Sequence, residues 1–148
     1  MLPQDLHDYN DVAENYDLYL DVMYNDEVNH TGFQEFYLDF AKEYGENGVI
    51  DIACGTGAVL LHLAEHGIYA DGTDLSEAMC RVADKKAKAK GFNLNIFAAN
   101  MTEFKSDKKY SCAIIARSGF MHLLTPDLQR AALLNIRENL LDGGMLTF

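Results

Sequence analysis

The chain has 148 residues, which is enough for one domain with a hydrophobic core and too short for two ordinary domains. Hydrophobic residues make up 49% of the sequence and charged residues 24%, a composition typical of globular rather than disordered or fibrous proteins. The formal net charge is −11, and the excess lies in residues 1–50, which hold twelve carboxylates and one lysine. Because such a segment repels a phosphate backbone, nucleic acid is disfavoured as a partner.

The sequence gives no sign of membrane insertion, secretion or disulfide bonding. It has no apolar run near the ~20 residues that a membrane helix needs, and no basic-then-apolar N-terminus. Its three cysteines, Cys54, Cys80 and Cys112, lie far apart and form no Cys-x-x-Cys pair. We therefore expect no membrane association and no disulfide framework or zinc ribbon, and the pattern favours a reduced, cytoplasmic protein.

Two helices are expected before a glycine-containing break at residues 45–48. Apolar and aromatic residues recur at steps of three and four over about 8–24 and again over about 27–44, as on one face of a helix. The remaining faces of both helices are strongly acidic. We expect residues 1–46 to form a helical appendage or lid, and residues 47–148 to form the core.

After the break, short apolar strands alternate with helices. Strands are expected over 49–53, 68–73, 93–99, 112–116 and from 145 onward. Helices are expected from the turn at 55–57 to Gly67, from a cap at Asp74 or Ser76 into the lysines of 85–90, and from Thr125-Pro126 to Leu141, closed by Gly143-Gly144. The alternation predicts an α/β fold with a Rossmann-like parallel sheet and helices on both faces. Because the sequence ends on a strand, we expect it to be truncated at the fifth strand of a longer domain.

The turn after the first strand is the most informative stretch, and it reads Asp51-Ile52-Ala53-Cys54-Gly55-Thr56-Gly57. Glycines there allow a sharp turn and the close approach of a ligand. Asp74 follows Gly55 by nineteen residues, at the tip of the second expected strand, where a carboxylate can bind both hydroxyls of a ribose. A dinucleotide site would need a third glycine where Leu60 stands, so an NAD-binding oxidoreductase fragment is the weaker alternative.

These motifs resemble those of the class I S-adenosylmethionine-dependent methyltransferases, in particular the bacterial small-molecule type. The first motif of that family, acidic-x-Gly-x-Gly-x-Gly, is matched with alanine in place of the first glycine. The matching residues and segments are Asp51, Ala53, Gly55 and Gly57, then Asp74, Asn100-Met101, 116–124, Leu141-Asp142-Gly143-Gly144 and Ala13-Glu14-Asn15-Tyr16-Asp17. The resemblance covers nearly the whole chain, which would hold five of the seven strands of the family fold.

The resemblance implies a cofactor site made by the loops that follow the first three strands. The glycine turn would hold the methionine part of S-adenosyl-L-methionine, and Asp74 would hold its ribose. Leu75 and Met79 would line the adenine pocket. In the segment Asn100-Met101, the side-chain carbonyl of Asn100 would accept a hydrogen bond from the adenine amino group.

The implied reaction is in-line transfer of a methyl group to an acceptor, with S-adenosyl-L-homocysteine as product. Tyr16 would close over the cofactor to exclude water, and Arg117 would pair with the cofactor carboxylate or an acidic acceptor, a structural salt bridge being the alternative. His122 is a weak candidate for a general base, needed only if the acceptor arrives protonated. The acidic, aromatic appendage favours a small neutral or cationic acceptor, and the oligomeric state stays open. Since the motifs describe donor binding rather than chemistry, a non-catalytic sensor or partner subunit is the alternative.

A separate motif, His62-Leu63-Ala64-Glu65-His66, matches the His-x-x-Glu-His pattern of some zinc proteases. Helical periodicity places Leu63 and Ala64 on the buried face and the two histidines and Glu65 on the outer side. The sequence presents no third ligand. We therefore expect a solvated helix face here and no metal site.

Overall fold

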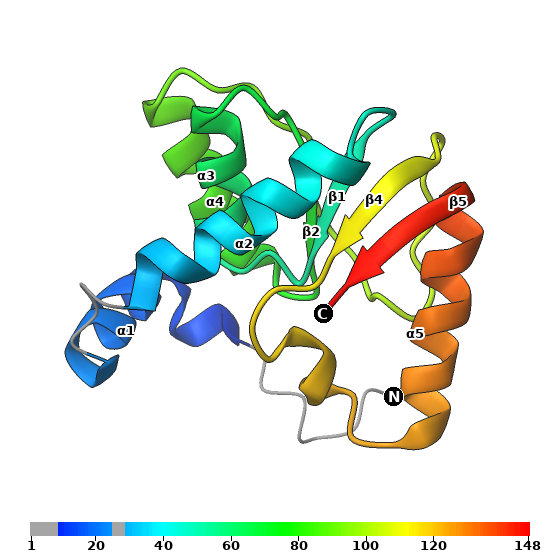
Figure 1. Cartoon of the computed structure of the whole chain (residues 1–148). Helices are drawn as coiled ribbons and strands as arrows, with labels where there is room; N and C mark the ends of the chain where they lie inside the picture. Colours follow the sequence, from blue (N-terminus) through cyan, green and yellow to red (C-terminus); the bar gives the residue numbers. More distant parts are fainter. Residues whose placement is uncertain (1–8, 25–28) are drawn as a thin grey trace.

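A five-stranded, all-parallel sheet organises the computed structural model, which describes residues 9–24 and 29–148 (Figure 1). Its strands are β1 (Val49–Ile52), β2 (Asp71–Asp74), β3 (Ile96–Ala98), β4 (Tyr110–Ile114) and β5 (Leu140–Thr147), in the spatial order β3-β2-β1-β4-β5. Every neighbouring pair is parallel. The predicted α/β fold with a Rossmann-like sheet is thereby confirmed.

Helices cover both faces of this sheet. They are α1 (Tyr16–Tyr24), α2 (Asn29–Tyr44), α3 (Ala58–Glu65), α4 (Glu77–Ala89) and α5 (Pro126–Asn139), with short 3-10 turns at Tyr9–Asp11, Ala13–Asn15 and Gly119–His122. Alternate side chains of β4 point to opposite faces. Ile114 packs with α2 and α3, whereas Ile115, just past the strand, packs with Ile136 of α5. The core is therefore two apolar layers, one on each side of the sheet.

The first expected helix is shorter than its apolar spacing predicts. Residues 9–15 form two 3-10 turns, and the α-helix begins only at Tyr16. The reason lies in Ala13, which is 1% exposed and packs against Ala78, Met79 and Val82 of α4. Contact with α4 decides the backbone here rather than helical propensity.

The last helix ends, and the last strand begins, at an earlier residue than the sequence predicts. The helix ends at Asn139 rather than Leu141, because the buried Asn139 side chain bonds the loop after β3, accepting from the Ser106 N–H at 3.1 Å. The strand begins at Leu140, which pairs with Tyr110, and its register shifts before Met145 pairs with Cys112. Gly143, with φ of 78°, lies in this irregular stretch, so the glycine pair forms a bulge within the strand rather than a helix stop.

The strand order places a crevice at one end of the sheet. From β1 the chain proceeds outward through β2 and β3, then returns to the other side of β1 to form β4 and β5 (Figure 1). In parallel α/β sheets, ligands bind outside the carboxyl ends of the strands where the order reverses, here between β1 and β4.

Cys54, Cys80 and Cys112 are all buried and free. Among residues 9–24 and 29–148, none of the helices combines the length and apolar character required to span a lipid bilayer.

A buried polar cluster closes the opposite end of the sheet. The Tyr110 side chain is fully buried and donates its hydroxyl hydrogen to Asp71 Oδ2 at 2.7 Å, and that hydroxyl oxygen lies 3.0 Å from Ser106 Oγ. The same Asp71 oxygen accepts from Asn95 at 3.2 Å and lies 3.0 Å from Lys108 Nζ. Burial raises the pKa of Tyr110 to about 12, so its hydroxyl keeps its proton and remains a donor.

Replacing Tyr110 with phenylalanine tests this cluster. We expect Tyr110→Phe to lower the free energy of unfolding by about 1–3 kcal/mol, because the buried Asp71 carboxylate loses a donor that water cannot replace. Tyr69→Phe is the matched control, since Tyr69 is 65% exposed, and it should change stability by less than about 0.5 kcal/mol. Urea denaturation of the three proteins measures both values. Equal midpoints for Tyr110→Phe and wild type would show that the hydroxyl contributes nothing.

Candidate functional site

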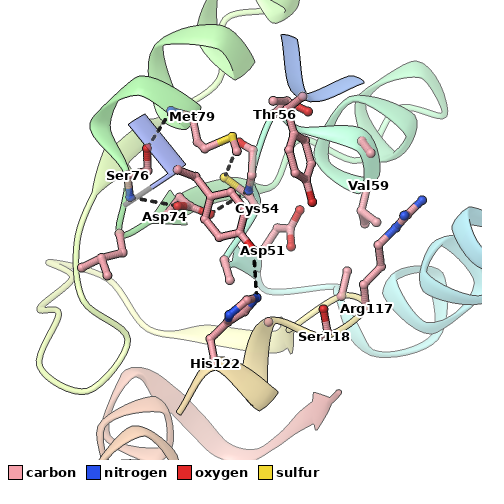
Figure 2. A pocket seen from close by; sticks show the side chains of 18 of the residues that line it. Asp51, Cys54, Thr56, Val59, Asp74, Ser76, Met79, Arg117, Ser118 and His122 are labelled. Carbon is pink, nitrogen blue, oxygen red and sulfur yellow. Dashed lines mark hydrogen bonds between the residues drawn. The ribbon is translucent and has the colours of Figure 1, made fainter. Parts of the chain in front are cut away.

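A cavity of about 710 Å³ opens at the carboxyl ends of β1 and β4 (Figure 2). Its walls come from the turns after β1 and β2, the loop after β3, the segment after β4, and parts of residues 9–33. The sequence-predicted residues that line it are Tyr16, Asp51, Ala53, Gly55, Asp74, Leu75, Met79, Asn100, Met101, Arg117 and His122. Gly57 is the one predicted residue that the fold does not bring to this wall.

The turn after β1 contains an alanine in a conformation that favours glycine. Ala53 has φ of 57°, a conformation that glycine adopts more easily than alanine, and the family motif that this turn resembles has glycine at this position. Its methyl group has room because Gly119 lies opposite: a Cβ on Gly119 would come within 3.0 Å of Ala53 Cβ and 2.9 Å of Ile115 Cγ2. Gly119, in the segment after β4, therefore leaves the space that the methyl group of Ala53 occupies.

Gly57 has a packing role rather than a lining one. It caps α3 with φ of 88°, and a Cβ there would lie 3.2 Å from the Cβ of Ala83 in α4. The absence of a side chain therefore lets the start of α3 pack closely on α4.

The Asp74 carboxylate connects the tips of β1 and β2. It accepts the Gly55 N–H at Oδ2, at 2.8 Å, and the Ser76 N–H at Oδ1, at 2.9 Å. The cap of α4 is Ser76, whose hydroxyl accepts the Met79 N–H at 3.2 Å, so Asp74 is not the helix cap. Burial raises the pKa of Asp74, while the two amide donors and the nearby His122 oppose that rise.

Asp51 is the most unusual group in the cavity wall. The residue is 1% exposed, and neither carboxylate oxygen has a hydrogen-bond partner among the residues that the structure describes. Burial raises the pKa of Asp51 to about 8, the Asp74 carboxylate adds to the rise, and the backbone of Leu60 opposes it weakly. Figure 2 shows Asp51 in the middle of the lining side chains, with Asp74 beside it. A buried carboxyl without a protein partner fits a site whose ligand supplies the partner.

The side chain of Asn100 is engaged differently from the expectation. Its Oδ1 accepts both the N–H of Thr102, at 3.0 Å, and the hydroxyl of Thr102, at 2.9 Å. These two bonds use both acceptor directions of the carbonyl oxygen. A bond from that oxygen to an adenine amino group would have to displace one of them.

Helix α1, which precedes α2, is hydrogen-bonded directly to the glycine turn. Asp17 of α1 accepts the Thr56 hydroxyl at 2.6 Å, and its other oxygen accepts from Lys86 of α4 at 2.7 Å. The sequence element 13–17 contains Asp17 but does not indicate what its side chain contacts. Its partners lie 39 and 69 residues away in the chain, so local pattern could not identify them.

Aromatic rings from this segment form one side of the cavity. Tyr9 and Tyr16 pack edge to face with centroids 5.7 Å apart, and the Tyr9 hydroxyl lies 3.5 Å from Nε2 of the exposed His122. The guanidinium of Arg117 lies 4.6 Å from the ring centroid of Phe33 in α2. Tyr9 and Phe33 line the cavity although no sequence motif singles them out, and their signal in the sequence is the aromatic richness of residues 1–44. The geometry gives Arg117 a cation–π contact, which the sequence did not predict.

A sequence profile of the family described as "Methyltransferase domain" matches residues 49–144, from the start of β1 into β5. The chain belongs to this methyltransferase family. A protein from Geobacillus named as a methyltransferase is 33% identical over 125 residues, which are 82% of this chain and 51% of that protein.

Solved structures agree with the family. The sugar N-methyltransferase KedS8 from Streptoalloteichus has a TM-score of 0.73 and 26% identity, over 88% of this chain and 51% of that one. An aminopentose methyltransferase from Micromonospora echinaspora, solved with S-adenosylmethionine bound, has a TM-score of 0.74 over 87% of this chain and 54% of that one. At 20% identity, the latter shows a shared fold only. The methyltransferase chain described here thus spans about half the length of these relatives.

The raised pKa of Asp51 predicts a specific dependence of stability on pH. Between about pH 4 and pH 8 the unfolded chain has ionised Asp51 while the folded protein keeps its proton, so this residue lowers stability as pH rises. Asp51→Asn removes that dependence. We expect the stability of the variant relative to wild type to increase from pH 5 to pH 8, by no more than about 1.4 kcal/mol per pH unit.

Urea denaturation at several pH values measures this difference. Asp142→Asn, at an exposed position of β5, corrects for the loss of one carboxylate from the chain. Parallel stability curves for Asp51→Asn and wild type would contradict the assignment of a raised pKa to Asp51.

Proposed function

We propose that this chain is the donor-binding part of an S-adenosylmethionine-dependent methyltransferase that acts on a small-molecule acceptor. The observation that carries the proposal is the buried, unpartnered carboxyl of Asp51 beside Asp74 in the cavity wall. Two carboxyls favour a ligand with cationic groups and hydroxyls, and they disfavour a pyrophosphate. The Gly55 N–H, which a phosphate would need at this turn, already donates to Asp74. The NAD alternative is accordingly the weaker one.

The residues present fit the cofactor part by part. Asp51 would face its ammonium group, and Asp74 would accept from its ribose hydroxyls. Leu75, which is 40% exposed, and the buried Met79 offer apolar surface for the adenine ring. When bound, S-adenosylmethionine supplies an activated methyl group on a sulfonium sulfur.

The tasks left to the protein are orientation and exclusion of water. We assign the second task to residues 1–46, whose described members Tyr9, Tyr16, Leu20 and Phe33 line the cavity and act as a lid over the core of 47–148. His122 lies at the cavity wall and is the candidate that could accept a proton from the acceptor.

The acceptor class is inferred from the relatives and from charge. KedS8, at 26% identity, is named as a sugar N-methyltransferase. The cavity carboxyls of this chain suit a neutral or cationic molecule better than an anionic one. We therefore propose a small molecule with an amine or hydroxyl acceptor atom, rather than nucleic acid.

Calorimetry with S-adenosylhomocysteine and NAD side by side tests the donor assignment. We expect micromolar binding of S-adenosylhomocysteine and no binding of NAD. Asp74→Ala should weaken the former by at least about 10-fold, because the ribose hydroxyls lose their acceptor. Asp142→Asn serves as control and should bind as wild type does. Binding of NAD alone would overturn the proposal.

Turnover separates an enzyme from a sensor. The full-length protein that contains this chain, given S-adenosylmethionine labelled in its methyl group and a panel of amino sugars, should release S-adenosylhomocysteine and labelled product. Asp51→Asn should reduce turnover at low cofactor concentration by at least about 10-fold, because the cofactor ammonium loses its partner. Tight cofactor binding with no product from any acceptor would favour the non-catalytic sensor.

A further inference from the structure

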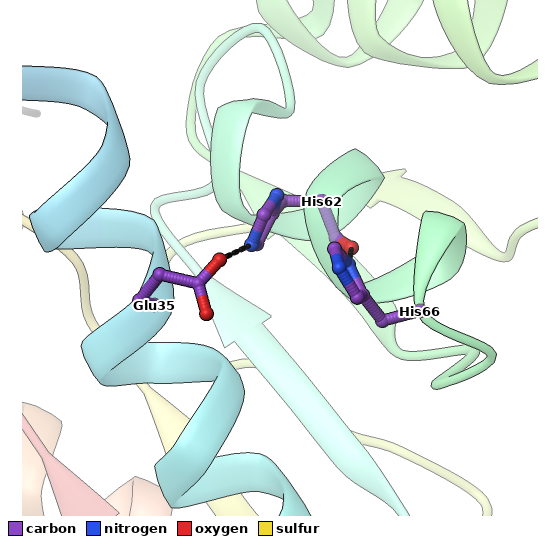
Figure 3. Close-up of side chains that lie close together, drawn as sticks. All are labelled: Glu35, His62 and His66. Carbon is purple, nitrogen blue, oxygen red and sulfur yellow. Dashed lines mark hydrogen bonds and ion pairs between the residues drawn. The ribbon is translucent and has the colours of Figure 1, made fainter.

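The two histidines of α3 have an acidic neighbour that the sequence did not reveal. His62 and His66 lie one turn apart at the end of α3, and Glu35 of α2 points toward them (Figure 3). Glu35 Oε1 is 3.0 Å from His62 Nε2, and the two imidazole centroids are 4.5 Å apart. The sequence offered no third candidate ligand because Glu35 lies 27 residues before His62, and the packing of α2 on α3 brings it there.

These three side chains can converge on one ion. One potential ligand atom from each lies within 4.8 Å of the other two. Zinc takes nitrogen and oxygen ligands at about 2.0–2.2 Å, which places neighbouring ligand atoms about 3.3 Å apart in a tetrahedron. The Glu35–His62 pair, at 3.0 Å, is close to that spacing. Because a carboxylate only accepts, His62 Nε2 carries the shared hydrogen, which must move to Nδ1 or to solvent before this nitrogen binds the ion. Rotation of the exposed Glu35 and His66 side chains would then bring in His66.

The hydrogen bond of His66 prepares it for metal binding. Its Nδ1 lies 2.9 Å from the carbonyl oxygen of His62, and a carbonyl only accepts, so Nδ1 carries the hydrogen. The lone pair of the neutral ring is then on Nε2. A backbone carbonyl that fixes one ring nitrogen while the other faces the ion is a common arrangement in metal sites.

The three side chains differ in exposure to solvent, and the nearby charge of Glu65 is paired. The His62 side chain is 15% exposed and Glu35 54%, so one ligand is held by packing while the others remain accessible. The nearest acidic residue on the same helix, Glu65, is paired with Lys90 at 2.6 Å. The donor set of two imidazoles and one carboxylate suits a transition-metal ion, whereas Mg²⁺ prefers oxygen ligands.

We propose that Glu35, His62 and His66 bind a divalent transition-metal ion, with Zn²⁺ as the best match, and that the ion fastens α2 to α3. This site is separate from the cavity and does not depend on the proposed function. It has a structural consequence because α2 also carries Gln34, whose amide donates to the Ala58 carbonyl at the start of α3 at 3.1 Å. An ion bridging the two helices would add a second link, one turn further along α3.

Titration of the tag-free chain with Zn²⁺ tests the proposal, with Mg²⁺ as the reference ion. We expect one Zn²⁺ per chain, no measurable Mg²⁺ binding at the same concentrations, and a higher Tm with Zn²⁺. His66→Gln and Glu35→Gln should each weaken Zn²⁺ binding by about 10-fold or more. The matched control is Asp39→Asn, which removes a carboxylate from an exposed position one turn along α2 and should bind Zn²⁺ as wild type does.

The variants also separate the proposal from misfolding and from the donor site. Without metal, the Tm of His66→Gln should equal that of wild type, since the residue is exposed. Asp74→Ala should keep its affinity for Zn²⁺ whatever happens to S-adenosylhomocysteine binding. Zn²⁺ affinity that is unchanged in His66→Gln would overturn the site. Affinity that is unchanged in Glu35→Gln would overturn the link between α2 and α3.

Discussion

The site depends on one hydrogen bond between the tips of two neighbouring parallel strands. The Gly55 N–H donates to Asp74 at 2.8 Å, so the turn after β1 and the end of β2 are fixed relative to each other. This bond holds the Asp74 carboxylate at the cavity wall, where it adds to the effect of burial in raising the pKa of Asp51. The same carboxylate therefore orders the turn after β1 and lines the cavity at the end of β2.

Burial of the Asp51 carboxyl lowers the stability of the protein without a ligand. Burial and the nearby Asp74 disfavour the charged form of Asp51, and the backbone of Leu60 opposes this effect. Neither carboxylate oxygen makes a hydrogen bond to a residue that the structure describes. Such strain is retained in a fold when a ligand relieves it, because binding then gains the energy that folding lost. The substitution of Ala53 for glycine has the same character: its φ of 57° is unfavourable for alanine, and the space beside Gly119 makes it tolerable. Both features lie within three residues of each other at the end of β1.

The sheet, its helices and most cavity residues could be predicted because their signals are local. Apolar runs ending in glycine give strand, turn and helix at 49–65, and the spacing of Asp74 follows from one βαβ unit. The contacts that were missed join residues distant in sequence, as Asp17 does with Thr56 and Glu35 with His62. The strand that began early, at Leu140, was missed because the glycine pair at 143–144 predicts a helix end equally well as a bulge.

The structure also changes what the net charge of −11 means for the ligand. The excess belongs to residues 1–50, and two of those carboxylates are engaged with the core: Asp17 with Lys86, and Glu35 with His62. The described residues of the appendage that line the cavity are aromatic or aliphatic, namely Tyr9, Tyr16, Leu20 and Phe33. The carboxyls in the wall between the strand tips, Asp51 and Asp74, come from β1 and β2. The two carboxyls between the strand tips therefore belong to the sheet, whereas the described lining residues of the appendage add apolar surface that lowers the local dielectric around them.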